Sequence, residues 1–302
     1  MKILVTGKEG QVARCLADRA ADHPDLDLVF AARAGTDILL DLARSETIRE
    51  AVRTVKPDVI INAAAYTNVD QAEDEPELAM QINGIAPGIL AEEASGCGAK
   101  IIQVSTDYVF DGTLDRPYLP DDPVNPIGVY GRTKLAGEEA VRAATNDHVI
   151  VRTAWVYSPY GRNFLRTMLR VAETRDEITV VDDQYGNPTS AFEIADGLLA
   201  IADRWRNDGT AGLGQVYHLA GSDETSWCGF ARAIFAESGK RGGPVTAVQA
   251  ISTADYPTKA SRPANSRLDC GKLERDFGFT APKLQTSLSQ VFDALSEFPS
   301  SQ

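Results

Sequence analysis

Apolar runs alternate with helix-like segments along the first 176 residues. Five runs are apolar along almost their whole length and predict buried strands at 2–7, 26–33, 57–65, 99–106 and 148–157. The segments after them place apolar residues three or four positions apart, which predicts helices at 10–23, 45–56, 76–98, 125–141 and 162–173. Such alternation is typical of a parallel sheet with crossover helices on both faces, whose strands are apolar because both faces are covered. The pattern therefore predicts an α/β fold with a doubly wound parallel sheet.

After about residue 176 the alternation becomes less regular. The pattern there predicts a strand and loop within 177–190, strand 215–221, helices 191–205, 226–238 and 284–298, and proline-containing loops before the last helix. We expect residues 1–176 to form the main domain, with the chain returning to it at about 191–221. Residues 177–190 and 222–302 are expected to form a smaller, interleaved C-terminal lobe that binds the substrate.

A glycine-containing loop follows the first predicted strand and opens the first predicted helix. It reads "TGKEGQVA", with Gly7, Gly10 and Ala13 in the spacing G-x-x-G-x-x-A. Glycines at this place allow a tight turn and let the backbone approach a pyrophosphate at the positive end of the helix. The alternative is a tight turn in another α/β fold, but the strand–helix context favours a dinucleotide-binding domain over residues 1–176.

The end of the second strand bears on the choice of cofactor. A carboxylate at this place normally binds the adenosine ribose of NAD, whereas "FAARAG" contains no acid and offers Arg33 for a 2′-phosphate. This favours NADPH over NADH, although Arg33 as a merely solvated side chain is the alternative. Asp41 and Leu42, after the next short run, are candidates to border the adenine.

Tyr130 and Lys134 are four residues apart in a segment predicted to be helical, so both side chains lie on one face. A phenol has a pKa near ~10, and a neighbouring cation lowers it, so the pair is a plausible acid/base couple. The pair alone is a weak signal, since the same spacing occurs by chance on solvated helices. It gains weight from the preceding strand, which ends in Ser105, Thr106 and Asp107 at the sheet edge where ligands bind.

Composition excludes several classes of function. The chain has 302 residues, 43% hydrophobic and 24% charged, with a net charge of −13, so it is globular and a poor candidate for binding nucleic acid. Its four cysteines and three histidines are scattered without metal-ligand spacing, so no metal, including Mg²⁺, is predicted. No apolar run approaches ~18 residues and no signal sequence is recognised, so we expect no membrane span and a cytoplasmic protein.

Several segments together resemble the extended short-chain dehydrogenase/reductases, and among them most closely the dTDP-4-dehydrorhamnose reductases. These segments cover nearly the whole chain in the order "TGKEGQVA", "NAAAYTNVDQAE", "VSTDYVFDG", "NPIGVYGRTKLAGE", "RTAWVY", "DQYGNPT" and "ASRPANSRLD". The glycine loop and Tyr-x-x-x-Lys are shared across the superfamily, whereas "STDYVFDG", "DQYG" and "SRPANSRL" are more specific. The resemblance implies a Rossmann-type fold and reduction of a nucleotide-linked 4-keto-6-deoxysugar with NADPH or NADH.

The resemblance also implies roles for single residues. Tyr130 would protonate the oxygen at C4 of the sugar, Lys134 would bind the nicotinamide ribose and lower the tyrosine pKa, and Thr106 would polarise the carbonyl. The implied substrate contacts are Thr106, Asp107, Trp155 and Arg262, with Arg262 on the diphosphate or, alternatively, in a structural ion pair. The implied and inferred cofactor contacts are Gly7, Gly10, Gln11, Val12, Arg33, Asp41, Leu42, Ala63, Ala64, Ala65, Tyr66, Thr67, Ser105, Tyr130 and Lys134.

Two other functions remain open at the level of the sequence. One is an epimerase or dehydratase of the same superfamily, which retains and recycles its NAD. The other is a non-catalytic nucleotide-binding regulatory subunit on the same fold. The presence of Thr106, Tyr130 and Lys134 together favours an enzyme. We expect a monomer or a homodimer acting on a small-molecule nucleotide sugar.

Overall fold

A seven-stranded parallel sheet forms the centre of the molecule. In this computed structural model, which describes residues 1–297, the strand order is β11-β6-β5-β4-β1-β2-β3 and every neighbouring pair is parallel. The strands are β1 Lys2–Thr6, β2 Asp27–Ala32, β3 Ile38–Leu39, β4 Val59–Asn62, β5 Lys100–Thr106, β6 His148–Thr153 and β11 Gln215–His218. This order confirms the doubly wound fold, because the chain winds outward in opposite directions from the neighbours β1 and β4.

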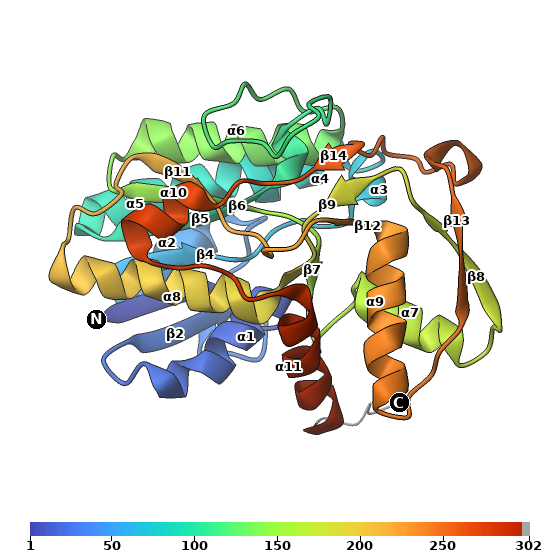
Figure 1. Cartoon of the computed structure of the whole chain (residues 1–302). Coiled ribbons are helices and arrows are strands. Elements are labelled where there is room, and N and C mark those ends of the chain that lie inside the picture. Colours follow the sequence, from blue (N-terminus) through green and yellow to red (C-terminus); the bar gives the residue numbers. More distant parts are fainter. Residues whose placement is uncertain (298–302) are drawn as a thin grey trace.

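Helices cover both faces of the sheet (Figure 1). One face carries α1 Gln11–Arg19 and α8 Ala191–Asn207, and the other carries α2 Ser45–Val55, α5 Ala86–Cys97 and α6 Val129–Ala144. Ile3 and Val5 pack in the core on the first face and Leu4 in the core on the second. This alternation is the two-residue period of a strand buried on both sides. Shorter helical elements are Ala20–Asp22, α3 Val69–Ala72, α4 Pro76–Met80, the π-helical turn Gln81–Ile85 and the 3-10 turn Asp107–Val109.

The remaining elements lie beside the sheet, with α7, α9, β8 and β13 toward the right of Figure 1. The helices are α7 Phe164–Ala172, α9 Trp227–Lys240, α10 Gly271–Phe277 and α11 Leu284–Glu297, with a 3-10 turn at Thr253–Asp255. The paired strands are β7 Val156–Tyr157 with β10 Thr189–Ser190, β8 Glu177–Val181 with β13 Ala247–Ile251, and β9 Tyr185–Gly186 between β12 Thr225–Ser226 and β14 Asn265–Ser266. β11 joins the main sheet, and α8 packs against α1. The division into two lobes stays a prediction.

Two expectations from the pattern need correction. The strand predicted over 148–157 ends at Thr153, and β7 belongs to a different sheet, because Trp155 has a φ of 48° and left-handed backbone cannot continue a strand. The loop-rich stretch before the last helix contains β13, β14 and α10. Within the described residues, no helix is both long enough and apolar enough to cross a bilayer.

Candidate active site

The glycine loop lies at the switch point of the sheet, between the ends of β1 and β4. Gly7 has a φ of 83°, and a Cβ placed on it would be 2.8 Å from the Cβ of Ala64. Its amide donates to the carbonyl of Ala31 at 2.8 Å, and the amide of Gly10 donates to the carbonyl of Gly7 at 2.7 Å. The turn is therefore closed tightly against the end of β4, in a conformation that favours glycine.

The start of α1 provides the features that a pyrophosphate needs. Gly10 caps the helix without a side-chain hydrogen bond, and the first turn carries no acidic residue. The positive end of the helix is thus open to an anion. Gln11 is held in place, because its Oε1 accepts from the hydroxyl of Ser158 at 2.8 Å and from Nδ2 of Asn163 at 2.9 Å. Val12 is buried behind the loop. These residues fit a dinucleotide.

The end of β2, where the adenosine of a dinucleotide is expected to lie, has an available cation. Arg33 is exposed at the end of β2 and forms no ion pair or side-chain hydrogen bond with any residue from 1 to 297. Beside it, Nζ of Lys8 donates to the carbonyl of Gly35 at 2.6 Å. Oδ1 of Asp41 accepts from the amide of Ala43 at 3.0 Å, so its carboxylate stabilises the turn that contains it. Leu42 is buried in the core beneath α2.

The segment after β4 forms the other wall of the switch point. Ala63, Ala64, Ala65 and Tyr66 are half-buried there, and Thr67 is exposed. The amide of Tyr66 donates to Oδ1 of Asn83 at 2.8 Å, and its hydroxyl donates to Oε2 of Glu75 at 2.8 Å. Burial, and then the Glu75 carboxylate, raise the pKa of Tyr66 to about 12. Asn83 lies on the π-helical turn and was missed by the sequence analysis, which predicted only regular helix there.

Lys134 is buried between α6 and β5. Its Nζ donates to the carbonyl of Val104 at 2.6 Å, and the residue is only 4% exposed. Burial lowers the pKa of Lys134 to about 8, and the negative charge of Glu138, one turn further along α6, opposes that change. The amine of Lys134 is therefore a weaker base in this site than that of a lysine in water.

Tyr130 lies at the start of the same helix, half-buried. Burial raises the pKa of Tyr130 above its ordinary value, the charge of Asp107 raises it further, and a hydrogen bond with Thr106 opposes the rise. The expectation that Lys134 lowers this pKa is wrong for this structure, because the ammonium is turned to Val104 and Asp107 faces the phenol. The phenol is protonated at neutral pH, the state required of an acid.

Thr106 and Asp107 face Tyr130 from the end of β5. The hydroxyl of Thr106 donates to Oδ1 of Asp107 at 2.9 Å and accepts from the amide of Tyr108 at 3.2 Å. Oδ2 of Asp107 is buried and has no hydrogen-bond partner among the described residues. Burial raises the pKa of Asp107 to about 6, and the nearby hydroxyls of Ser266 and Thr106 oppose that rise. Oδ2 therefore keeps unused hydrogen-bonding capacity next to Tyr130 and Thr106.

Ser105 is directed elsewhere. Its hydroxyl donates to Oε1 of Glu138 at 2.6 Å between β5 and α6, and the residue is 3% exposed. The structure therefore brings Thr106, but not the hydroxyl of Ser105, to the tyrosine.

Tyr108 joins the site and was missed from the sequence, although it lies inside the "STDYVFDG" segment. Its ring meets that of Tyr130 edge-on, with 5.5 Å between ring centroids and 77° between planes. Arg262 donates to the Tyr108 hydroxyl at 3.1 Å and to Oδ2 of Asp70 at 2.7 Å. Arg262 thus reaches the site from the C-terminal segment, with Asp70 as its present ion-pair partner.

Trp155 lies half-buried between β6 and β7. Its indole stacks on that of Trp227, with centroids 3.6 Å apart and an interplanar angle of 10°. A Cβ at Gly186 would lie 2.5 Å from Cε2 of Trp155, so the glycine makes room for the indole. Trp227 was not singled out from the sequence, because its contact with Trp155 joins segments far apart in the chain.

Comparison with known proteins identifies the family. The family model described as "RmlD substrate binding domain" matches residues 1–297. The chain belongs to this family. It is 46% identical over 295 residues to a dTDP-4-dehydrorhamnose reductase of Sinorhizobium fredii, covering 98% of each chain.

Solved structures agree with this assignment. The structure of a Clostridium acetobutylicum dTDP-4-dehydrorhamnose reductase matches with a TM-score of 0.88 and 36% identity, covering 98% of this chain and 100% of that one. The structure of a Bacillus anthracis dTDP-4-dehydrorhamnose reductase in complex with NADP matches with a TM-score of 0.85 and 33% identity, covering 97% and 99%. Both likenesses extend over both halves of the molecule, so the predicted superfamily and Rossmann-type fold are confirmed.

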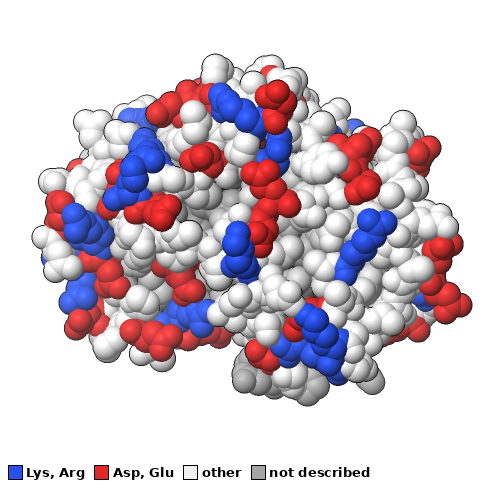
Figure 2. Space-filling model, in the orientation of Figure 1, with Lys and Arg blue, Asp and Glu red and all other residues white. Residues whose placement is uncertain are grey.

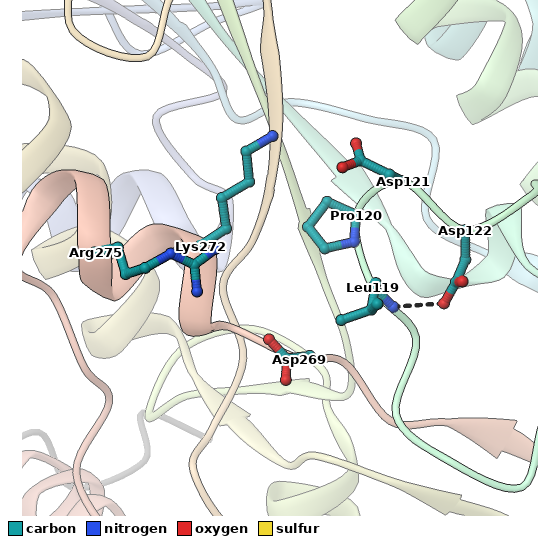
Figure 3. A pocket seen from close by; sticks show the side chains of 7 residues that line it. All are labelled: Leu119, Pro120, Asp121, Asp122, Asp269, Lys272 and Arg275. Carbon is teal, nitrogen blue, oxygen red and sulfur yellow. Dashed lines mark hydrogen bonds between the residues drawn. The ribbon is translucent and has the colours of Figure 1, made fainter.

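A separate pocket of about 370 Å³ lies between the loop 119–122 and α10 (Figure 3). Lys272 and Arg275 enter it from α10, opposite Asp121 and Asp122, and none of the predicted site residues lines it. Within residues 1–297 no group of three or more His, Cys, Asp or Glu side chains is placed to hold a metal ion.

Proposed function

We propose that this protein is an NADPH-dependent dTDP-4-dehydrorhamnose reductase. It reduces the C4 keto group of dTDP-4-dehydro-L-rhamnose to give dTDP-L-rhamnose for nucleotide-sugar and cell-surface polysaccharide biosynthesis. The observation that supports the proposal is the proximity of Tyr130, at the start of α6, to Thr106 and Asp107 at the carboxyl end of β5. The family membership supports the same substrate class.

Each residue has a defined task in this proposal. Bound NADPH supplies the hydride. Tyr130 donates its phenolic proton to the C4 oxygen, so that hydride and proton together convert the ketone to an alcohol. The Thr106 hydroxyl turns from Oδ1 of Asp107 to donate to the same oxygen, and Oδ2 of Asp107 accepts from a neighbouring sugar hydroxyl. The Trp155 indole covers the apolar face of the sugar.

The cofactor and the diphosphate are bound by cations and by backbone. Gly7, Gly10 and Gln11 hold the pyrophosphate at the start of α1, and Arg33 pairs with the 2′-phosphate of NADPH. Lys134 binds the nicotinamide ribose, and Arg262 takes the substrate diphosphate. The residues after β4 line the nicotinamide side of the cleft. A cytoplasmic location and a monomeric or homodimeric state stay predictions.

The test is a pair of absorbance assays with dTDP-4-dehydro-L-rhamnose, one with NADPH and one with NADH. We expect one equivalent of NADPH to be consumed per keto sugar, and faster consumption with NADPH than with NADH. In Tyr130→Phe, turnover should fall by roughly 10²–10⁴-fold, because the proton donor is lost. The dissociation constant for NADPH, measured by fluorescence, should change less than about twofold, because that phenol contributes little to cofactor affinity.

The other functions give different outcomes. An epimerase or dehydratase converts a nucleotide sugar without net consumption of NADPH. A regulatory subunit binds the ligands and turns nothing over. Full activity of Tyr130→Phe would contradict the assignment of the acid.

A further inference from the structure

The third turn of α6 carries a buried carboxylate, one turn beyond Lys134. Tyr130, Lys134 and Glu138 follow one another at four-residue intervals, so they form a ladder on one face of the helix. Glu138 is 0% exposed. The proposed chemistry uses the first two residues of the ladder and leaves the third without a task.

Glu138 is held by two strands. Its Oε1 accepts from the hydroxyl of Ser105 at 2.6 Å and from Nε of Arg152 at 2.9 Å, and its Oε2 accepts from Nη2 of Arg152 at 2.8 Å. Oε2 also accepts from Nη2 of Arg142, one turn further along α6, at 3.1 Å. This paired geometry fixes both oxygens. Burial is the largest single influence on the pKa of Glu138 and raises it, but the hydrogen bonds and charge of Arg152, with Ser105 and Arg142, together keep that pKa below its ordinary value.

Two consecutive residues of β5 bind Lys134 and Glu138. The carbonyl of Val104 accepts from Lys134 at 2.6 Å, and the next residue, Ser105, donates to Glu138. These two contacts fix the position of α6 along β5 and the rotation of α6 about its own axis. They explain why Ser105 is turned away from the cleft.

We propose that Glu138 is a positioning residue for the catalytic pair: held by Ser105 and Arg152, it keeps the Lys134 ammonium charged in its buried site and fixes α6 over β5. This inference rests on the proposed function of Tyr130 and Lys134. The Coulomb attraction of a buried carboxylate one turn away favours the protonated lysine, in the direction already noted for its pKa.

The other charged and titratable groups on the elements around these three residues do not supply this negative charge to Lys134. Arg142 and Arg152 carry the opposite charge, and Asp107 acts on Tyr130. On the elements packed against α6, the remaining groups are Tyr108 on the 3-10 turn, Asp70 and Glu73 at α3, Glu77 on α4, Glu92, Glu93 and Cys97 on α5, Lys100 on β5 and His148 on β6. Among them, Asp70 pairs with Arg262 and Glu93 with Arg49 and Arg53.

The test replaces Glu138 by glutamine in the full chain and measures the titration of Lys134 directly. Lysine labelled with ¹³C at Cε is followed by NMR from neutral to alkaline pH, and its Lys134 signal is assigned by comparison with Lys134→Met. We expect the midpoint to fall by about one pH unit in Glu138→Gln, because the amide no longer favours the ammonium. The alkaline limit of kcat should move down by the same amount.

Glu139→Gln is the matched control, since Glu139 is the next residue on α6 but is exposed. It should leave the midpoint and the kcat profile unchanged. Because Arg152 is left unpaired in Glu138→Gln, the double variant Glu138→Gln with Arg152→Gln is measured in parallel. Its Lys134 midpoint should fall less than in Glu138→Gln, because the guanidinium that disfavours the ammonium is removed together with the carboxylate.

An unchanged Lys134 midpoint, even with lower thermal stability, would overturn the inference and leave Glu138 as a structural residue. The NMR readout needs no turnover. Failure of NADPH consumption by the unmodified protein would therefore count against the proposed function, and an unmoved midpoint would count against Glu138 alone.

Discussion

At the scale of single residues, Tyr130, Lys134 and Asp107 share one physical property. Burial is the largest cause of the pKa change of each. Removal from water disfavours the charged form, so the phenol and the carboxyl keep their protons more firmly and the ammonium releases its proton more easily. Desolvation therefore sets the direction of these three pKa changes, and the neighbouring charges modify their size.

Asp107→Asn should raise thermal stability at alkaline pH. The folded pKa of Asp107 is raised to about 6 from 3.8, so the native protein loses stability as the pH rises through this window. When Asp107 ionises, the native protein loses roughly 1–3 kcal/mol of unfolding free energy, and the variant does not. The variant should therefore show a higher midpoint of thermal unfolding at pH ~8, with a smaller gain at pH ~5. Its turnover should fall, because a ligand of the sugar is changed.

Asp111→Asn serves as a control of opposite sign. Hydrogen bonds from Thr113 lower the pKa of Asp111 to about 2. This carboxylate therefore contributes stability above pH ~4, and the contribution is lost as the pH falls from there toward the lowered pKa. The variant should be less stable than the native protein at pH ~8. An equal effect of both substitutions would contradict the assigned cause.

At the scale of elements, the connection from β1 to α1 determines where a dinucleotide can lie. The turn at Gly7 touches the segment after β4, so two elements on opposite sides of the switch point share one contact. Any side chain at this turn must displace the end of β4 or open the start of α1. The cofactor site is thus a property of two neighbouring elements together.

Gly7→Ala should weaken NADPH binding by at least about tenfold and destabilise the fold by roughly 2–3 kcal/mol, because backbone strain adds to the clash with Ala64. The matched control is Gly98→Ala, since Gly98 also has a positive φ of 74° but no atom within 4 Å of the added methyl. The Gly98→Ala variant should lose about 1 kcal/mol of unfolding free energy and keep its affinity for NADPH. Titration calorimetry and thermal unfolding measure the two quantities; equal affinities would refute the clash.

At the scale of the whole molecule, segments far apart in the chain meet across the cleft. Asp70 accepts from the amide of Ala260 at 3.0 Å and from Arg262, and Lys259 pairs with Asp74. On the surface as a whole, acidic and basic side chains are intermingled on the face shown in Figure 2, so the net charge of −13 does not form one continuous field there. An anionic substrate therefore depends on local cations such as Arg262.

Arg262→Met should raise the KM for the nucleotide sugar by about tenfold or more with a smaller change in kcat, because a cation for the diphosphate is lost. Asp70→Asn removes the same ion pair but leaves the cation, so its KM should stay equal or fall. Both variants should lose at most about 1 kcal/mol of stability, since Asp70 is 44% exposed. Steady-state kinetics decide the matter, and equal KM values for Arg262→Met and the native protein would leave Arg262 a structural residue.

The parts of the site that were predictable are those defined within a few residues. The glycine loop needs only its place between a strand and a helix, and Tyr130 and Lys134 share a face because a helix turns once in about four residues. The parts that were not predictable join distant segments: Arg262 meets Tyr108, and Trp227 stacks on Trp155. The raised pKa of Tyr130 belongs with these, because burial depends on all the elements around it.

The sequence by itself determined the alternation of strands and helices, the doubly wound class and the pairing of Tyr130 with Lys134, because these depend on local periodicity. Only the tertiary structure decided that Ser105 turns to Glu138, that Trp155 leaves the strand, and that Asp107 has a free buried oxygen. Those outcomes depend on which side chains compete for the same buried hydrogen bonds. That competition is settled only when the sheet, α6 and the C-terminal segment pack together.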